Sequence, residues 1–187
     1  MTVLHKDLWV SFIKGDDEAL NTLYNNFVDV LYSFGLRFSD DVDLVKDSIH
    51  DLFVDLYKYR KTLSNDVNVK SYLFTALKRK ICLVLKKKAI QESHIFEAPF
   101  LLSCSIEEQI IDGEEQSILL AKLRKQLALL PGRQKEAVYL RFNAELEYEE
   151  IAAIMDISLE TCRTLVYRGL KQLRERMVVN HIYKILA

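Results

Sequence analysis

Small polar and basic side chains recur at helical spacing close to the carboxyl end of the chain. On a helix from Leu159 to about Met177, one face would carry Glu160, Thr161, Arg163, Thr164, Tyr167, Arg168 and Lys171, with Ser158 just before it. Small polar residues near a helix N-terminus allow close approach to base edges, while arginine and lysine bind guanine or phosphate. The pattern therefore predicts a helix that reads duplex DNA.

The elements in front of this helix are marked by their terminal residues. Pro131 suits the first position of a helix that runs to about Phe142. Four acidic residues then crowd the start of the next helix, where the positive end of the helix dipole favours them: Glu145, Glu147, Glu149 and Glu150. A turn at Asp156–Ile157 leads to Ser158, which suits the N-cap of the following helix. Two helices joined by a tight turn predict a helix-turn-helix, although a plain helical hairpin has the same local pattern.

The other face of the last helix is apolar. Its expected buried residues are Leu159, Cys162, Val166, Leu170 and Leu173. Because Cys162 lies on this stripe, a buried thiol is expected there and not a nucleophile.

A second group of candidate DNA-binding residues lies in the middle of the chain. Turn-forming residues occupy the loop 62–68, and a basic helix is expected over 69–88. The basic and aromatic candidates in this region are Tyr72, Lys78, Arg79 and Lys80. An aromatic side chain here could stack on an unpaired base. Helical spacing turns only one of Tyr72 and Phe74 outward, and the hydroxyl favours Tyr72.

A third group lies on the segment 43–57. Apolar residues recur there every three or four positions and predict one buried stripe, namely Leu44, Val45, Ser48, Ile49, Leu52, Phe53 and Leu56. Asp47, His50 and Asp51 fall on the opposite face, where two carboxylates one turn apart suit a basic partner surface. The helical spacing of the same three residues would also allow a metal site, but we expect a solvated helix face there.

No residue pattern for catalysis competes with these groups. The four histidines are scattered without an HExxH pattern, the three cysteines form no CxxC, and no two glycines lie close enough for a phosphate-binding loop. We therefore expect no enzyme activity, no cofactor and no small-molecule substrate. Unpaired cysteines and the lack of a secretory signal pattern or an apolar run longer than five residues predict a cytoplasmic protein.

Composition and charge favour two helical parts. With 5 Gly and 2 Pro in 187 residues, the chain has too few turn formers for an all-β fold. The net charge of −1 hides segregation. By segment it is −5 over 1–60, +7 over 61–90, −7 over 91–120 and +4 over 121–187. Two positive blocks separated by acidic stretches are typical of a chain that contacts a polyanion at two places.

Two stretches of the chain resemble a known family. Leu130–Glu175, with Leu-Pro, Tyr-Glu-Glu-Ile-Ala and Arg-Gly-Leu-Lys-Gln-Leu-Arg in order, resembles the promoter-reading helix-turn-helix of bacterial sigma factors. Asp43–Lys88 resembles their other conserved domain. The resemblance covers about 150 of the 187 residues, and the most similar group is the small extracytoplasmic-function sigma factors. It implies an all-α protein with two small helical domains on a flexible linker: 1–88, an acidic linker 89–111, and a helix-turn-helix domain 112–187.

The resemblance also implies partners and residue roles. The family binds core RNA polymerase, reads the minus-thirty-five and minus-ten elements of promoter DNA and melts the second; an anti-sigma factor is a common further partner. Ser158 and the polar face after it match positions facing the upstream element, and Asp47, His50 and Asp51 match the face that docks on polymerase. The loop 65–68 with the helix 70–80 matches the part that captures a minus-ten base, which adds Asn65, Asp66, Asn68, Lys70 and Ser71 to the candidates there.

The chain departs from the family at four positions. Glu147 stands where a capping Ser or Thr is usual, which predicts a weaker cap. Arg79, Leu83 and Leu165 replace residues usual in the two DNA-binding helices, so the promoter sequence does not follow by analogy. A polymerase-independent helix-turn-helix regulator and a helical adaptor without DNA contacts are the alternatives.

Overall fold

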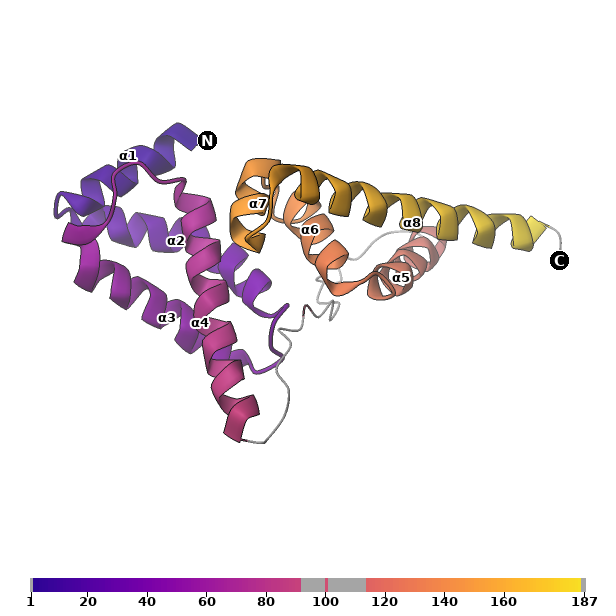
Figure 1. The fold of residues 1–187 in the computed structure, drawn as a ribbon, viewed down its shortest axis with the longest axis horizontal. Coiled ribbons are helices and arrows are strands. Elements are labelled where there is room, and N and C mark those ends of the chain that lie inside the picture. Colours follow the sequence, from indigo (N-terminus) through magenta and orange to yellow (C-terminus); the bar gives the residue numbers. More distant parts are fainter. Residues whose placement is uncertain (1, 92–99, 101–113, 186–187) are drawn as a thin grey trace. The chain divides into compact units, whose positions relative to one another are not determined.

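The computed structural model describes residues 2–91, 100 and 114–185, and these contain helices and no strand (Figure 1). The chain divides into two compact units. The first comprises residues 1–99 with 153–156, and the second comprises 100–152 with 157–187. The predicted all-α class is confirmed. None of the helices within the described ranges combines the length and the apolar character needed to cross a bilayer.

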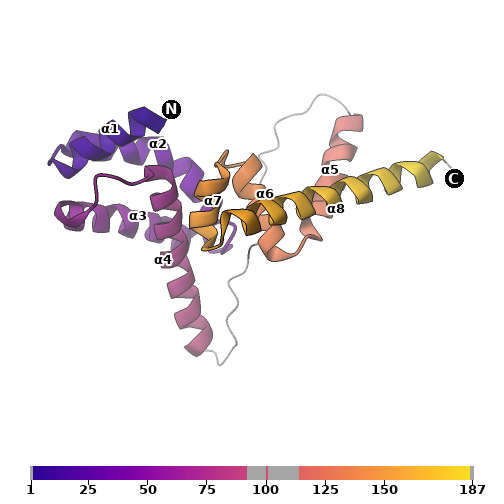
Figure 2. The same ribbon diagram turned by 45° about the horizontal axis from the view of Figure 1, so that its top comes forward.

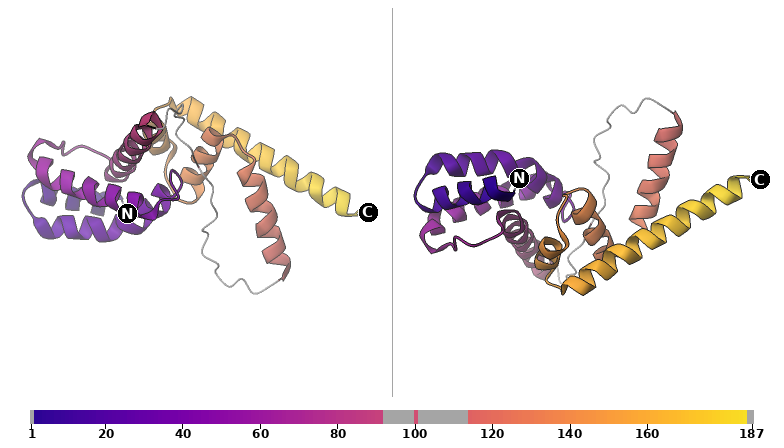
Figure 3. Two further views of the ribbon diagram at one scale, coloured as in Figure 1. Left: turned by 90° about the horizontal axis from the view of Figure 1, so that it is seen from below. Right: turned by 90° about the horizontal axis from the view of Figure 1, so that it is seen from above.

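The first unit is built from α1 (Thr2–Ile13), α2 (Asp17–Gly35), α3 (Val42–Tyr59), a 3₁₀ turn η1 (Arg60–Thr62) and α4 (Val69–Gln91). Aspartates start two of the helices: the Asp16 carboxylate accepts from the backbone N–H groups of Glu18 and Ala19, and Asp41 accepts from Leu44. Such caps satisfy donors that have no partner inside the helix. The α2 helix packs against α1, α3 and α4, as two opposite views show (Figure 3).

Aromatic and branched side chains fill the core of this unit. Trp9, Phe34 and Phe74 are fully buried and come from three different helices. The buried residues of α3 are those of the expected stripe, from Leu44 to Leu56, so the prediction from periodicity is confirmed. Gly35 allows α2 and α3 to approach closely, since an added Cβ would lie 2.6 Å from Val45 Cγ1.

The second unit contains α5 (Glu114–Ala128), α6 (Gly132–Phe142), α7 (Tyr148–Met155) and α8 (Leu159–Ile185), and both α5 and α6 pack on the long α8 (Figure 2). The expected helix to Phe142 is present, but Pro131 is its N-cap and not its first residue. Pro131 has φ −55° and ψ 143°, an extended backbone from which the helix starts at Gly132. Most of the predicted linker lies outside the described residues, as does Cys104, while 89–91 complete α4.

Candidate nucleic-acid interface

The turn between α7 and α8 has the geometry that a helix-turn-helix requires. Asp156 adopts a left-handed conformation with φ 53°, which reverses the chain, and the N–H of Ile157 donates to the carbonyl of Ala152 at 3.0 Å. Ser158 Oγ then accepts from the N–H of Thr161 at 3.1 Å. Ser158 is therefore the N-cap of α8, as its position in the sequence predicts.

The outward face of α8 carries the predicted DNA-binding side chains. Thr164 is half-buried. The other predicted residues are exposed, namely Ser158, Glu160, Thr161, Arg163, Tyr167, Arg168 and Lys171. The Ser158 and Thr161 hydroxyl oxygens lie 2.8 Å apart at the start of the helix. The short polar groups and the cations thus share one surface that begins at the helix N-terminus.

The buried face of α8 differs from the predicted stripe at two positions. Cys162, Val166 and Leu173 are buried and Leu159 is half-buried, but Leu170 is 38% exposed. Gly169 takes its place against α6, because a Cβ at Gly169 would lie 2.8 Å from Val138 Cγ2. The expectation for Leu170 was wrong because an apolar stripe does not show where two backbones come close. Burial raises the pKa of the Cys162 thiol, which fits a core cysteine.

Arg163 is supported by side chains from the preceding helix. Its guanidinium lies 5.9 Å from the ring centre of Tyr148 and 4.0 Å from Glu149 Oε1. Arg141 of α6 lies 5.0 Å from the same ring. The Tyr148 ring thus lies within cation–π distance of two arginines and helps to hold Arg163, a predicted base-reading residue. No pattern in the sequence indicated this role for Tyr148.

The start of α7 lacks a hydroxyl cap, as Glu147 implies, but its backbone groups find other partners. The N–H of Glu147 donates to Glu150 Oε2 at 2.7 Å, which is the carboxylate half of a capping box. Arg141 Nη1 donates to the carbonyl of Leu146 at 2.8 Å and lies 3.2 Å from Glu147 Oε2. These bonds fix Glu147 and the entry to α7, but they involve other groups than the helix N–H groups from which a capping Ser or Thr hydroxyl would accept.

In the first unit, the predicted minus-ten residues lie on the loop before α4 and on α4 itself. Asn68 Oδ1 accepts from the N–H of Ser71 at 2.9 Å and caps α4. Asn65 and Asp66 are exposed, Lys70 is half-buried, and Ser71 is buried, so the Ser71 side chain is not on the surface. Of the two aromatic candidates, Phe74 is fully buried and Tyr72 is half-buried. Tyr72 is thus the more exposed of the two, as predicted, but part of its ring is covered.

Tyr72 packs on a residue from the first helix. Its ring centre lies 5.3 Å from that of Trp9, and burial together with the Asp55 carboxylate raises the pKa of the Tyr72 hydroxyl. Trp9 and its neighbour Lys6 contact the loop as well, and the sequence patterns did not identify them. The one available signal was that Trp9 is the only tryptophan of the chain.

The basic residues of α4 differ in their surroundings. Arg79 is exposed, whereas Lys78 lies 5.8 Å from the ring centre of Phe38. Lys80 Nζ lies 2.5 Å from a carboxylate oxygen of Asp55, and Lys88 Nζ lies 3.2 Å from one of Asp41. Asp41 has a lowered pKa, chiefly because it accepts from the Leu44 N–H and next because it bonds Lys88.

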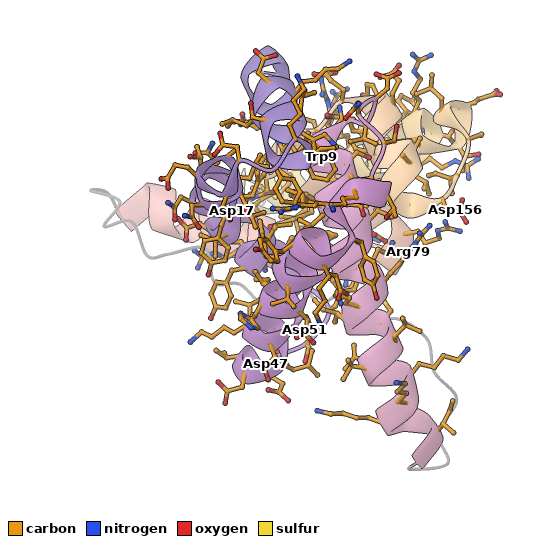
Figure 4. The ribbon with its side chains drawn as sticks, turned by 90° about the vertical axis from the view of Figure 1, so that its left-hand side faces the viewer. Trp9, Asp17, Asp47, Asp51, Arg79 and Asp156 are labelled. Atoms are coloured by element: carbon orange, nitrogen blue, oxygen red, sulfur yellow. The ribbon has the colours of Figure 1, made fainter. Side chains whose placement is uncertain are left out.

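Asp47, His50 and Asp51 are exposed on α3, opposite the buried stripe, and Figure 4 shows Asp47 and Asp51 projecting from that helix. Their placement matches the polar face that the sequence predicts. Throughout the part of the chain that the structure describes, no three His, Cys, Asp or Glu residues are grouped so that they could hold a metal ion. The three residues thus form an acidic face with one imidazole.

Comparison with known proteins agrees with this geometry. Residues 120–173 match the family model described as "Sigma-70, region 4". The chain is 28% identical over 150 residues to RNA polymerase sigma factor SigV of Bacillus subtilis (strain 168), covering 80% of this chain and 82% of the relative. It is 21% identical over 156 residues to ECF RNA polymerase sigma factor SigM of the same bacterium, covering 83% and 93%.

Two solved structures share the fold. One is of CnrH in complex with the cytosolic domain of CnrY, with a TM-score of 0.61, 16% identity and coverage of 93% of this chain and 97% of that chain. The other is the sigma factor RpoE in complex with the anti-sigma factor NepR from Bartonella quintana, with a TM-score of 0.59, 20% identity and coverage of 85% and 96%.

The fold, the helix-turn-helix and the family match define the class: the chain carries a sigma-70 region 4 domain and is homologous to bacterial RNA polymerase sigma factors. Within that class, the similarity over most of the chain is to the extracytoplasmic-function group.

Proposed function

We propose that the protein is a transcription initiation factor that binds core RNA polymerase, recognises two promoter elements and assists melting of the second. The observation that carries the proposal is α8, whose capped N-terminus and outward polar and basic face follow a helix-turn-helix turn in the region that matches sigma-70 region 4. Such a helix is able to place short side chains against base edges in a major groove.

Each predicted group of residues has a role in this proposal. The outward face of α8 reads the upstream element, with Arg168 and Lys171 on phosphates. The loop 65–68 and the α4 residues Lys70, Lys78, Arg79 and Lys80 contact the minus-ten element, with Tyr72 beside the unpaired strand. Asp47, His50 and Asp51 bind a basic surface of polymerase. The corresponding domains are 1–88 and 112–187, and the acidic segment 89–111 joins them, although its first residues, 89–91, belong to α4.

The proposal also covers the location of the protein, its lack of catalytic activity and one regulatory partner. It acts in the cytoplasm, where polymerase is, and it has no catalytic activity, cofactor or small-molecule substrate of its own. An anti-sigma factor is a further proposed partner, supported by the two solved structures of similar fold, which contain CnrY and NepR respectively.

The decisive experiment is capture of core RNA polymerase by the purified protein, followed by run-off transcription on genomic fragments. We expect capture, and discrete transcripts that appear only when both components are present. Salt-dependent DNA binding without polymerase capture would instead show a polymerase-independent regulator. Absence of both would leave a helical adaptor.

A further inference from the structure

The first helix makes three contacts with the loop that precedes α4 and with the first turn of α4 itself. Trp9 Nε1 donates to the carbonyl oxygen of Ser64 at 2.9 Å, and the Trp9 ring packs on Tyr72 with 5.3 Å between ring centres. Lys6 Nζ lies 2.9 Å from Asp66 Oδ1. The partners on the loop side are 55 to 63 residues further along the chain, so these contacts are tertiary and not part of any local turn.

These contacts differ in strength. The Lys6–Asp66 ion pair is exposed on both sides, and such pairs contribute little because solvent and salt screen them. Trp9 is fully buried, so its indole N–H is shielded from water and its hydrogen bond to Ser64 fixes the entry to the loop. Trp9 is therefore the main anchor, and Lys6 only adds to it.

The loop has a second fixed point at its other end. There, Asn68 caps α4 by accepting from the N–H of Ser71. At the start of the loop, the N–H of Asp66 donates to Ser64 Oγ at 3.2 Å. Between the two ends, Asn65 and Asp66 are exposed. A short loop held at both ends presents its exposed side chains in few conformations, so little ordering entropy is lost when it binds a ligand.

We infer that Trp9 is a positioning residue for minus-ten recognition: from α1 it fixes the loop 64–68 and the Tyr72 ring, and so determines how accurately they discriminate the bases they meet. This inference rests on the proposed function of the loop. Trp9 itself touches no nucleic acid, because its side chain is fully buried. Its effect is on the conformation of the loop.

The test compares Trp9→Phe, which keeps an aromatic ring and removes the N–H donor, with Ile49→Val, a matched core substitution. Ile49 is buried on α3 and none of the contacts described above involves it. Both variants are assayed as holoenzyme with core polymerase in run-off transcription. The templates are one promoter identified with the wild-type protein and two sets of single-base variants, one of the minus-ten and one of the minus-thirty-five element.

We expect Trp9→Phe to lower minus-ten discrimination by roughly two- to tenfold, the range that corresponds to one hydrogen bond. Discrimination at the minus-thirty-five element should stay unchanged, and hydrogen exchange at residues 64–68 should accelerate. Ile49→Val should change neither selectivity. Unchanged minus-ten discrimination in Trp9→Phe, or an equal loss at both elements, overturns the inference. Failure of the wild-type holoenzyme to initiate at all would refute the proposed function itself.

Discussion

Replacement of Gly169 by alanine tests the packing of the helix-turn-helix directly. A Cβ at this position would lie 2.8 Å from Val138 Cγ2, closer than carbon atoms can approach. Val138 is buried on α6, and a β-branched side chain on a helix has essentially one χ1 rotamer, so it cannot turn away. The two helices must therefore separate, or the side chain must be strained.

The expected magnitude is a balance of two effects. Overpacking of this kind costs about 1–3 kcal/mol, whereas alanine in place of glycine inside a helix gains about 0.5–1 kcal/mol. We therefore expect Gly169→Ala to lower the free energy of unfolding of the second unit by about 1 kcal/mol. Gly132→Ala is the control for adding a methyl group without a clash, because no atom lies within 4 Å of a Cβ there; Gly132 is the first residue of α6, so the helix-propensity gain should be smaller than at Gly169.

The single tryptophan allows the two units to be followed separately. Trp9 lies in the first unit, so its fluorescence reports only on that unit, whereas far-ultraviolet circular dichroism follows the helices of both. Gly169→Ala should shift the dichroism transition and leave the fluorescence transition in place. Gly132→Ala should shift neither to lower denaturant.

A second substitution provides the refutation. Val138→Ala alone should cost about 1–2 kcal/mol, since it removes two buried methyl groups. In that background the close contact is gone, so Gly169→Ala should become neutral or stabilising. Equal losses from Gly169→Ala with valine and with alanine at position 138 would show that the contact between α6 and α8 is not the cause.

Three further outcomes follow from the proposed interface. Ser158→Ala should destabilise α8 by about 0.5–2 kcal/mol in dichroism melts, and Ser158→Asp, which can also cap, should not; equal losses would contradict the capping role. Arg163→Ala should reduce discrimination among upstream-element variants by about 1–3 kcal/mol in binding titrations, whereas a uniform loss on all sequences would mean a phosphate contact. Asp51→Lys should leave the melt unchanged and weaken polymerase capture, with Asp7→Lys on α1 as the control; undiminished capture would refute the assignment of this face.

The elements that the sequence predicted well are those with strong periodicity or a cap. All seven residues of the α3 stripe are buried, because a helix on a core surface must bury one face. The N-cap role of Ser158 also followed from its type and position. Both features depend only on residues close together in the chain.

The features that the sequence did not reveal depend on tertiary neighbours. Gly169 and not Leu170 faces α6, because Val138 comes close to the α8 backbone. This close approach depends on how α6 packs against α8. Trp9 contacts a loop 55 residues away, and no local pattern carries that information.

The ion pairs along α4 affect how DNA binding should respond to added electrolyte. Lys80 and Lys88 already have the carboxylates of Asp55 and Asp41 beside them, which act as built-in counterions. A cation neutralised in this way displaces fewer small ions from a nucleic acid when it binds. Each phosphate neutralised contributes about −0.9 to the slope of log affinity against log salt on duplex DNA. The slope contributed by α4 should therefore be shallower than its lysine and arginine content implies, by up to about 1.8, the contribution of two phosphates.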